Sequence, residues 1–114
     1  MRRVLAFGLL ALTLLAGGAS AASFNCKVAK ASDEKAICDS MALSDLDVKM
    51  ATLFDVATHL VAMGQRGALR DAQAEFLKAR AACKFNKVCL TSAYQTRITA
   101  LEAVLQSIYA RGPF

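Results

Sequence analysis

The sequence predicts an all-α protein, a small antiparallel helical bundle of one short and three longer helices with two disulfides. Apolar residues recur every three or four positions along three stretches of the chain, which is the period of an amphipathic helix. No stretch alternates apolar and polar residues between turn signals, as a half-buried strand would. Four cysteines follow an N-terminal export signal, and an even number in a short exported chain is typical of disulfides.

The first 21 residues have the organisation of a secretory signal peptide. Two arginines are followed by the apolar run 4–15 and by small residues that provide a cleavage site near Ala21 or Ala22. A lipid-attachment cysteine is missing from that site, and no later apolar stretch approaches the ~20 residues of a membrane span. We therefore expect residues 22–114 to form a single exported domain, soluble in the periplasm rather than lipid-anchored and with no membrane span after cleavage.

The composition excludes one large class of partners. The whole chain carries a net charge of +5, and removing the two signal arginines from its 14 basic residues leaves 12 against 9 acidic ones, a net +3. These charges are scattered, so nucleic acid is not an expected partner. A domain of about 92 residues buries only about 60–65% of its unfolded surface, so we expect crosslinks to supply part of its stability.

The first predicted helices follow from capping residues and apolar spacing. After an irregular segment over 23–31, Ser32 is expected to cap a short helix over 33–39, with carboxylates in its first turn. Ser44 is expected to begin the next helix, with Asp47 as its capping-box partner three residues later.

The rest of the bundle is divided by glycines and by one irregular stretch. The sequence Gly-Gln-Arg-Gly at 64–67 is expected to end the first long helix in a short turn. A second long helix is predicted over 69–83, an interruption over 84–88, and a third long helix over 90–108. Short connections of this kind make sequential helices antiparallel neighbours.

Four cysteines permit three pairings, and the sequence alone does not choose among them. We favour the local pairs Cys26–Cys38 and Cys83–Cys89, because each pair flanks an irregular stretch beside a helix end. The eleven and five intervening residues differ from the short knuckles of structural zinc sites, and no C-x-x-C redox motif is present. The cysteines therefore predict disulfides rather than a metal site.

The sequence predicts no catalytic site and no cofactor, and hence a protein that is not an enzyme. His59 is the only histidine, and the carboxylate of Asp55, four residues earlier, makes no triad with it. No glycine-rich phosphate loop and no nucleophile elbow is present. Arg80 and Arg97 fall on or beside apolar stripes, so we expect their stems to pack and their heads to pair with a carboxylate or a carbonyl.

Residues of three blocks match the pattern of one protein family. The pattern has an aromatic-x-Cys entry, a Glu-Lys-x-Ile-Cys turn and a Leu-x-x-Leu-Asp helix start, followed by two helical blocks around the second cysteine pair. The matching positions are Phe24 to Cys26, 32–38, Leu43, Leu46, Asp47 and Met50; Leu69, Ala72, Gln73, Phe76, Leu77, Arg80 and Cys83; and Cys89, Tyr94, Arg97, Ile98 and Leu101. With these residues the chain resembles the LprI-type lysozyme-inhibitor family, a small exported helical module with a recurring cysteine framework.

Two positions depart from that family's pattern. Phe76 stands where the family often has tryptophan, and Ala81 where it often has aspartate. The best-known members are also lipoproteins, and this chain lacks the cysteine that carries the lipid.

The resemblance implies an exported binding protein that inhibits lysozyme by occluding it through protein–protein contact. Animal lysozymes are strongly basic, and their tight inhibitors commonly present carboxylates to them. The expected partner-binding surface is therefore the local acidic cluster Asp33, Glu34, Asp39, Asp45 and Asp47.

The alternative is an interaction module of the cell envelope that binds wall polymer, anionic lipid or another periplasmic protein. Its expected surface is the basic second long helix with the loop that follows. The residues of that surface are Arg66, Arg70, Lys78, Arg80, Lys84 and Lys87.

Overall fold

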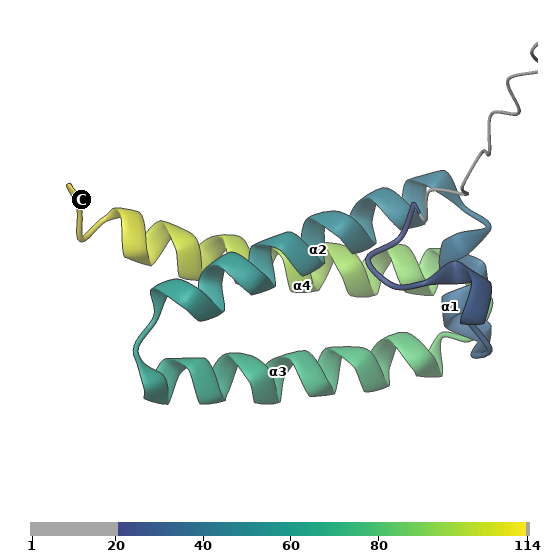
Figure 1. Cartoon of the computed structure of the whole chain (residues 1–114), viewed down its shortest axis with the longest axis horizontal. Coiled ribbons are helices and arrows are strands. Elements are labelled where there is room, and N and C mark those ends of the chain that lie inside the picture. Colours follow the sequence, from purple (N-terminus) through teal and green to yellow (C-terminus); the bar gives the residue numbers. More distant parts are fainter. Residues whose placement is uncertain (1–20, 114) are drawn as a thin grey trace, which may run out of the picture.

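The computed structural model describes residues 21–113, and within that range the chain forms four α-helices, one short 3-10 turn and no strand (Figure 1). The predicted signal peptide, 1–21, lies outside this range except for its last residue. The all-α prediction of one short and three longer helices is confirmed. The elements in chain order are η1 (Cys26–Val28), α1 (Ser32–Cys38), α2 (Met41–Leu60), α3 (Met63–Ala82) and α4 (Lys87–Tyr109).

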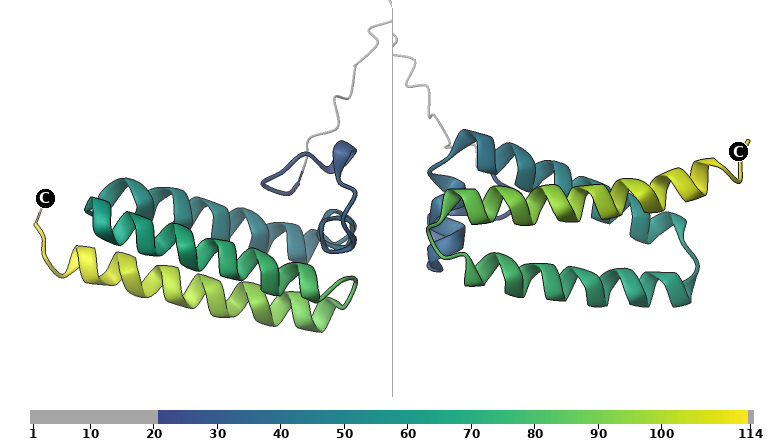
Figure 2. Two further views of the ribbon diagram at one scale, coloured as in Figure 1. Left: turned by 90° about the horizontal axis from the view of Figure 1, so that it is seen from below. Right: turned by 180° about the vertical axis from the view of Figure 1, so that it is seen from behind.

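The three long helices run antiparallel in sequence order, and α1 lies across one end of them (Figure 1 and Figure 2). α4 packs along α2 over much of its length, whereas α3 contacts the two through fewer residues. Among residues 21–113, no helix is both long enough and apolar enough to cross a membrane.

The core lies between α2 and α4 and is closed by α1. The aliphatic side chains of Ile37, Leu90 and Leu101 are completely buried, and burial of each such side chain stabilises the fold by about 1.5–3 kcal/mol. The Phe76 and Tyr94 rings meet at 5.3 Å between centroids and join α3 to this core. Only Leu69, Phe76 and Arg80 of α3 are buried, so α3 is the most weakly held of the long helices.

Two predicted helix starts are wrong by one to four residues. Ser32 is the first residue of α1 rather than its cap, and Ala31 precedes it with no side-chain hydrogen bond. Ser40 caps α2, since its Oγ accepts a hydrogen bond from the backbone N–H of Leu43 at 3.2 Å. Ser44 lies inside α2, where its buried hydroxyl donates to the backbone carbonyl of Ile37 at 2.7 Å. A tertiary bond to α1, and not a cap, therefore accounts for this serine.

The predicted turn at 64–67 is also wrong. α2 ends at Leu60 and α3 already begins at Met63, so the glycines of this stretch lie inside α3. The turn is instead closed by Arg66. Its Nε donates a hydrogen bond to the backbone carbonyl of Thr58 at 2.7 Å, and a terminal guanidinium nitrogen donates to the backbone carbonyl of Val61 at 3.5 Å. These bonds satisfy carbonyls that the end of a helix leaves free, so the chain turns without a left-handed glycine.

Replacement of Gly67 by alanine tests whether the turn lies at 64–67, as predicted, or between Leu60 and Met63, as observed. Inside α3 a Cβ at this position meets no atom within 4 Å, so Gly67→Ala should raise the free energy of unfolding by about 0.5–1 kcal/mol. If Gly67 instead adopted a positive φ in a turn, the same substitution would lower the free energy of unfolding. Urea denaturation followed by far-UV circular dichroism measures the change, and a loss of stability would contradict the observed start of α3.

The connection between α3 and α4 is shorter than the predicted interruption over 84–88, because α4 begins at Lys87. Asn86 caps α4 by accepting the backbone N–H of Cys89 at 3.0 Å, and Lys84 adopts a left-handed φ of 53° just after α3. The structure confirms both local disulfides, Cys26–Cys38 and Cys83–Cys89, and leaves no free cysteine among residues 21–113.

Candidate functional site

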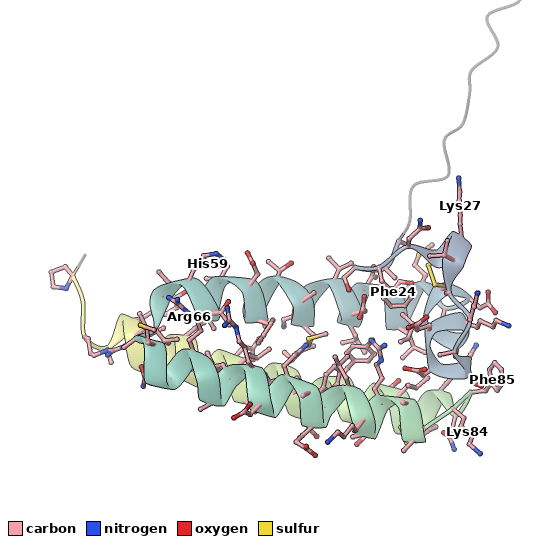
Figure 3. All side chains as sticks on the ribbon, turned by 60° about the horizontal axis from the view of Figure 1, so that its bottom comes forward. Phe24, Lys27, His59, Arg66, Lys84 and Phe85 are labelled. Carbon is pink, nitrogen blue, oxygen red and sulfur yellow. A yellow bond between two sulfur atoms is a disulfide. The ribbon has the colours of Figure 1, made fainter. Side chains whose placement is uncertain are left out.

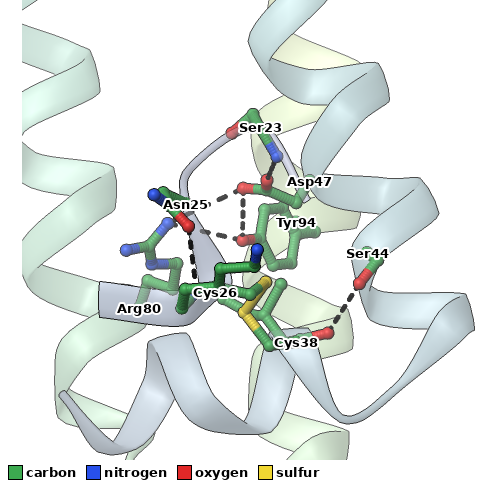
Figure 4. The surroundings of a disulfide bond; sticks show 10 residues. Ser23, Asn25, Cys26, Cys38, Ser44, Asp47, Arg80 and Tyr94 are labelled. Carbon is green, nitrogen blue, oxygen red and sulfur yellow. Dashed lines mark hydrogen bonds and ion pairs between the residues drawn. A yellow bond between two sulfur atoms is a disulfide. The ribbon is translucent and has the colours of Figure 1, made fainter. Parts of the chain in front are cut away.

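A buried network of charged and polar side chains lies between the helices near the Cys26–Cys38 disulfide (Figure 4). Its centre is Arg80 of α3, whose Nε donates to Asp33 Oδ2 of α1 at 2.7 Å. The same guanidinium lies 3.7 Å from Asp47 Oδ1 of α2 and 3.5 Å from the hydroxyl of Tyr94 on α4. All four side chains are shielded from solvent, with Asp47 and Tyr94 fully buried. One arginine therefore links all four α-helices.

The segment before the first disulfide completes this network. Asp47 accepts the Tyr94 hydroxyl at 2.8 Å through Oδ1 and the backbone N–H of Ser23 at 2.7 Å through Oδ2. The ring of Phe24 lies 5.5 Å from the Arg80 guanidinium, which is within the range of a cation–π contact. The N-terminal segment is thus fixed on the bundle by polar contacts as well as by the disulfide.

The charges of the network determine the protonation of its members. Burial would by itself lower the pKa of Arg80, but interactions with Tyr94 and Asp33 outweigh it and raise the pKa above its ordinary value. Burial raises the pKa of Tyr94, and the neighbouring Asp47 carboxylate raises it further, against the opposing effect of Arg80. At neutral pH the guanidinium is therefore charged and the phenol keeps the proton that it donates to Asp47.

The raised pKa of Tyr94 predicts a loss of stability in alkali. Below about pH 10 the phenol is neutral in both the folded and the unfolded chain, so it does not make the free energy of unfolding depend on pH. Above that pH the unfolded chain releases the proton while the folded chain keeps it, so the free energy of unfolding should fall by about 1.4 kcal/mol per pH unit from this group. Urea denaturation between pH 9 and 11 should show a shallower decline for Tyr94→Phe, whereas Tyr109→Phe, at an exposed position, should match the wild type. Equal slopes for all three proteins would contradict this assignment.

The acidic cluster predicted as a partner-binding surface is divided by the fold. Asp33 and Asp47 are 3% and 0% exposed and both face Arg80, so including these two in a surface was wrong. Glu34 is half-buried on α1, and Asp39 and Asp45 are exposed. The expectation that the Arg80 head pairs with a carboxylate is confirmed, and that pairing is what removes the two aspartates from the surface.

The three remaining carboxylates lie at what we call the disulfide-bonded end, residues 26–45 and 83–89. Large apolar side chains are also exposed there: Val28 is 67%, Met41 81%, Phe85 62% and Val88 81% accessible to solvent. Figure 3 shows Phe85 and Lys84 projecting from the turn between α3 and α4, at the same end as α1. Both disulfides lie within this end and restrain its backbone. The sequence did not reveal these four side chains as exposed because all of them lie outside the predicted helices, where the apolar period gives no information on which side chains face solvent.

The basic residues of the alternative prediction do not form one surface. Arg80 is buried, Arg66 bonds the end of α2, and Lys78 pairs with Glu75 at 2.9 Å on the exposed face of α3. Lys84 follows Arg66 by 18 residues, which along a helix corresponds to about 27 Å, and Figure 3 shows the two at opposite ends of the bundle.

His59 is also an ordinary surface residue. It lies on the exposed face of α2, where its Nδ1 contacts the Asp55 carbonyl at 2.7 Å and the Asp55 carboxylate at 3.6 Å.

Comparison of the chain with models of protein families, with curated proteins and with solved structures finds no match. The resemblance to the LprI-type family therefore rests on the residues quoted above. Several of those residues now have structural roles: the cysteines form the two disulfides, and Asp47, Arg80 and Tyr94 belong to the buried network.

Proposed function

We propose that this chain is an exported, LprI-like binding protein that inhibits lysozyme by covering it with the disulfide-bonded end. The observation that carries the proposal is the exposure of Phe85, Val88 and Met41 on a surface fixed by two disulfides. Exposed apolar groups that gather on one surface of a small protein commonly mark an interaction site.

A fixed surface suits an inhibitor that acts by occlusion. Binding costs the conformational freedom of the side chains and loops that become ordered, and a surface that is already ordered avoids most of that cost. The turn around Phe85 is closed by Cys83–Cys89 and continues directly into α4, capped by Asn86. An aromatic side chain presented on such a turn is the kind of anchor that contributes most of the binding energy in protein interfaces.

The exposed carboxylates Glu34, Asp39 and Asp45 supply local contacts for a basic partner. Lysines of the same end, Lys84 and Lys87 among them, offset these charges, so the net charge of the end gives little electrostatic steering. Apolar contact should therefore contribute most of the affinity, and the carboxylates should determine orientation and salt dependence.

The test is residual lysozyme activity in the presence of the oxidised protein. We expect saturable inhibition at micromolar concentrations, and an inhibition constant at least tenfold weaker for Phe85→Ala/Val88→Ala, because the apolar anchor is lost. The matched control, Met63→Ala/Tyr109→Ala, removes exposed apolar side chains from the opposite end and should inhibit like the wild type.

A second pair of variants separates local carboxylate contacts from net charge. Asp39→Lys/Asp45→Lys and Asp71→Lys/Glu75→Lys change the net charge equally, but only the first pair alters the disulfide-bonded end. Asp39→Lys/Asp45→Lys should weaken inhibition, and the effect should be larger at low salt. Asp71→Lys/Glu75→Lys should leave inhibition unchanged. Absence of inhibition with several types of lysozyme would overturn the proposal. Equal weakening by both pairs would overturn the assigned surface.

A further inference from the structure

Arg97 of α4 is a buried arginine that has no negatively charged partner among residues 21–113. Its side chain is held between α3 and α4, where Nε donates to the Gln73 side-chain oxygen at 2.9 Å and a terminal nitrogen donates to the Leu69 carbonyl at 3.3 Å. The Phe54 ring lies 6.0 Å from the guanidinium carbon. The residue is only 8% exposed, and no carboxylate among residues 21–113 forms an ion pair with it.

The contrast with Arg80 shows what Arg97 lacks. Arg80 is equally buried but has two carboxylates, at 2.7 and 3.7 Å. A buried cation with only neutral partners is costly, and burial lowers the pKa of Arg97, whereas interactions with Tyr94 and Asp33 raise that of Arg80. The two N–H groups that bond Gln73 and Leu69 leave other donors of the planar guanidinium for an anion.

Arg97 lines a hollow between α3 and α4. Its volume is about 320 Å³, and Gln65 and Arg97 are the only polar residues in its lining. Alanines at 68, 72 and 100 line it where larger side chains would fill the space between α3 and α4. The weak packing of α3 therefore leaves an apolar hollow with one positive charge in its wall. The residues of the lining are Val61, Gln65, Ala68, Leu69, Ala72, Arg97, Ala100 and Val104.

We propose that this hollow binds a single-chain amphiphile with a carboxylate head, such as a free fatty acid. The carboxylate accepts N–H groups of Arg97, and the alkyl chain lies along the alanines of the hollow. Carboxylate and guanidinium are matched in geometry, and their hydrogen bonds are stronger when shielded from water. A second hollow, also lined by Arg97, has the polar residues Glu75, Ser92 and Thr96 in its lining. The alkyl chain therefore binds in the first hollow, whose lining is more apolar. This site is independent of the lysozyme proposal, because it lies along α3 and α4 and not at the disulfide-bonded end.

The test is a calorimetric titration of the oxidised protein with dodecanoate below its micelle concentration. We expect one saturable site and a rise in the thermal midpoint on binding. Dodecanol, which has the chain without the charge, should bind at least tenfold more weakly, and acetate, which has the charge without the chain, should not bind measurably. Dodecanol binding as tightly as dodecanoate would overturn the role of the guanidinium, and absence of dodecanoate binding would overturn the site.

Two variants test the charge and the hollow separately. Arg97→Gln should weaken dodecanoate binding at least tenfold while leaving dodecanol binding unchanged, and Arg70→Gln, at an exposed position, should leave both unchanged. Ala100→Leu keeps Arg97 but fills the hollow, so it should abolish binding, whereas Ala74→Leu on the exposed face of α3 should not. Dodecanoate binding by Ala100→Leu tests the site even if Arg97→Gln fails to fold. Wild-type affinity in Ala100→Leu would overturn the proposal.

Discussion

Replacement of Arg80 by methionine should lower the free energy of unfolding by about 3–5 kcal/mol. The change leaves the carboxylates of Asp33 and Asp47 buried with no cation between them, and it removes the link between α3 and the other helices. A domain of this size has only about 5–15 kcal/mol of stability, so the variant should be partly unfolded at 37 °C. Urea denaturation followed by circular dichroism measures the loss.

Two further variants make this prediction specific. Arg70→Met removes an exposed arginine from the same helix and should change the stability by no more than about 0.5 kcal/mol. Adding Asp33→Asn and Asp47→Asn to Arg80→Met should recover part of the loss, because the two buried negative charges are then gone. If Arg80→Met and Arg70→Met were equally stable, the buried network would not hold the helices together.

Removal of the disulfides should have the next largest effect. In the chain-entropy model the 12-residue separation of Cys26–Cys38 contributes about 3 kcal/mol and the 6-residue separation of Cys83–Cys89 about 2 kcal/mol. We expect paired cysteine-to-alanine variants to lose at least these amounts, measured as the shift of their urea unfolding curves.

The loss for Cys26→Ala/Cys38→Ala should exceed the chain-entropy value. This disulfide fixes the segment that places the Ser23 N–H on Asp47 and the Phe24 ring against Arg80, so its removal also weakens the buried network. The Cys83→Ala/Cys89→Ala variant serves as the comparison, because its short turn is also held by the Asn86 cap. A larger loss for the second pair, or no loss for either, would contradict this account.

The sequence was sufficient for the features that depend on local pattern. The apolar period gave the number and order of the helices, and the position of each cysteine pair beside a helix end gave the correct disulfides. The start of α2 was missed because Ser40 and Ser44 are both plausible caps ahead of the same apolar run. The hydrogen bond from Ser44 to the carbonyl of Ile37 decides between them, and it depends on how α1 folds back on α2.

The features that were missed depend on contacts between distant residues. Glycines at 64 and 67 favour a turn locally, but Arg66 closes the turn three residues earlier by bonding back to Thr58. Asp33 and Arg80 are 47 positions apart, as are Asp47 and Tyr94, and a helix-start aspartate looks exposed until its partner is known. The one usable signal was the placement of Arg80 and Arg97 on or beside apolar stripes, which predicts packed stems and heads paired with a carboxylate or a carbonyl.

The most direct test of the proposed function is hydrogen exchange of the oxidised protein with and without saturating lysozyme. The buried network holds the fold, and the proposed partner-binding surface is the disulfide-bonded end. The proposal predicts new protection in the turn around Phe85 and in the first turn of α2, with amides in the middle of α3 unchanged. Protection confined to α3, or no change at any amide, would contradict it.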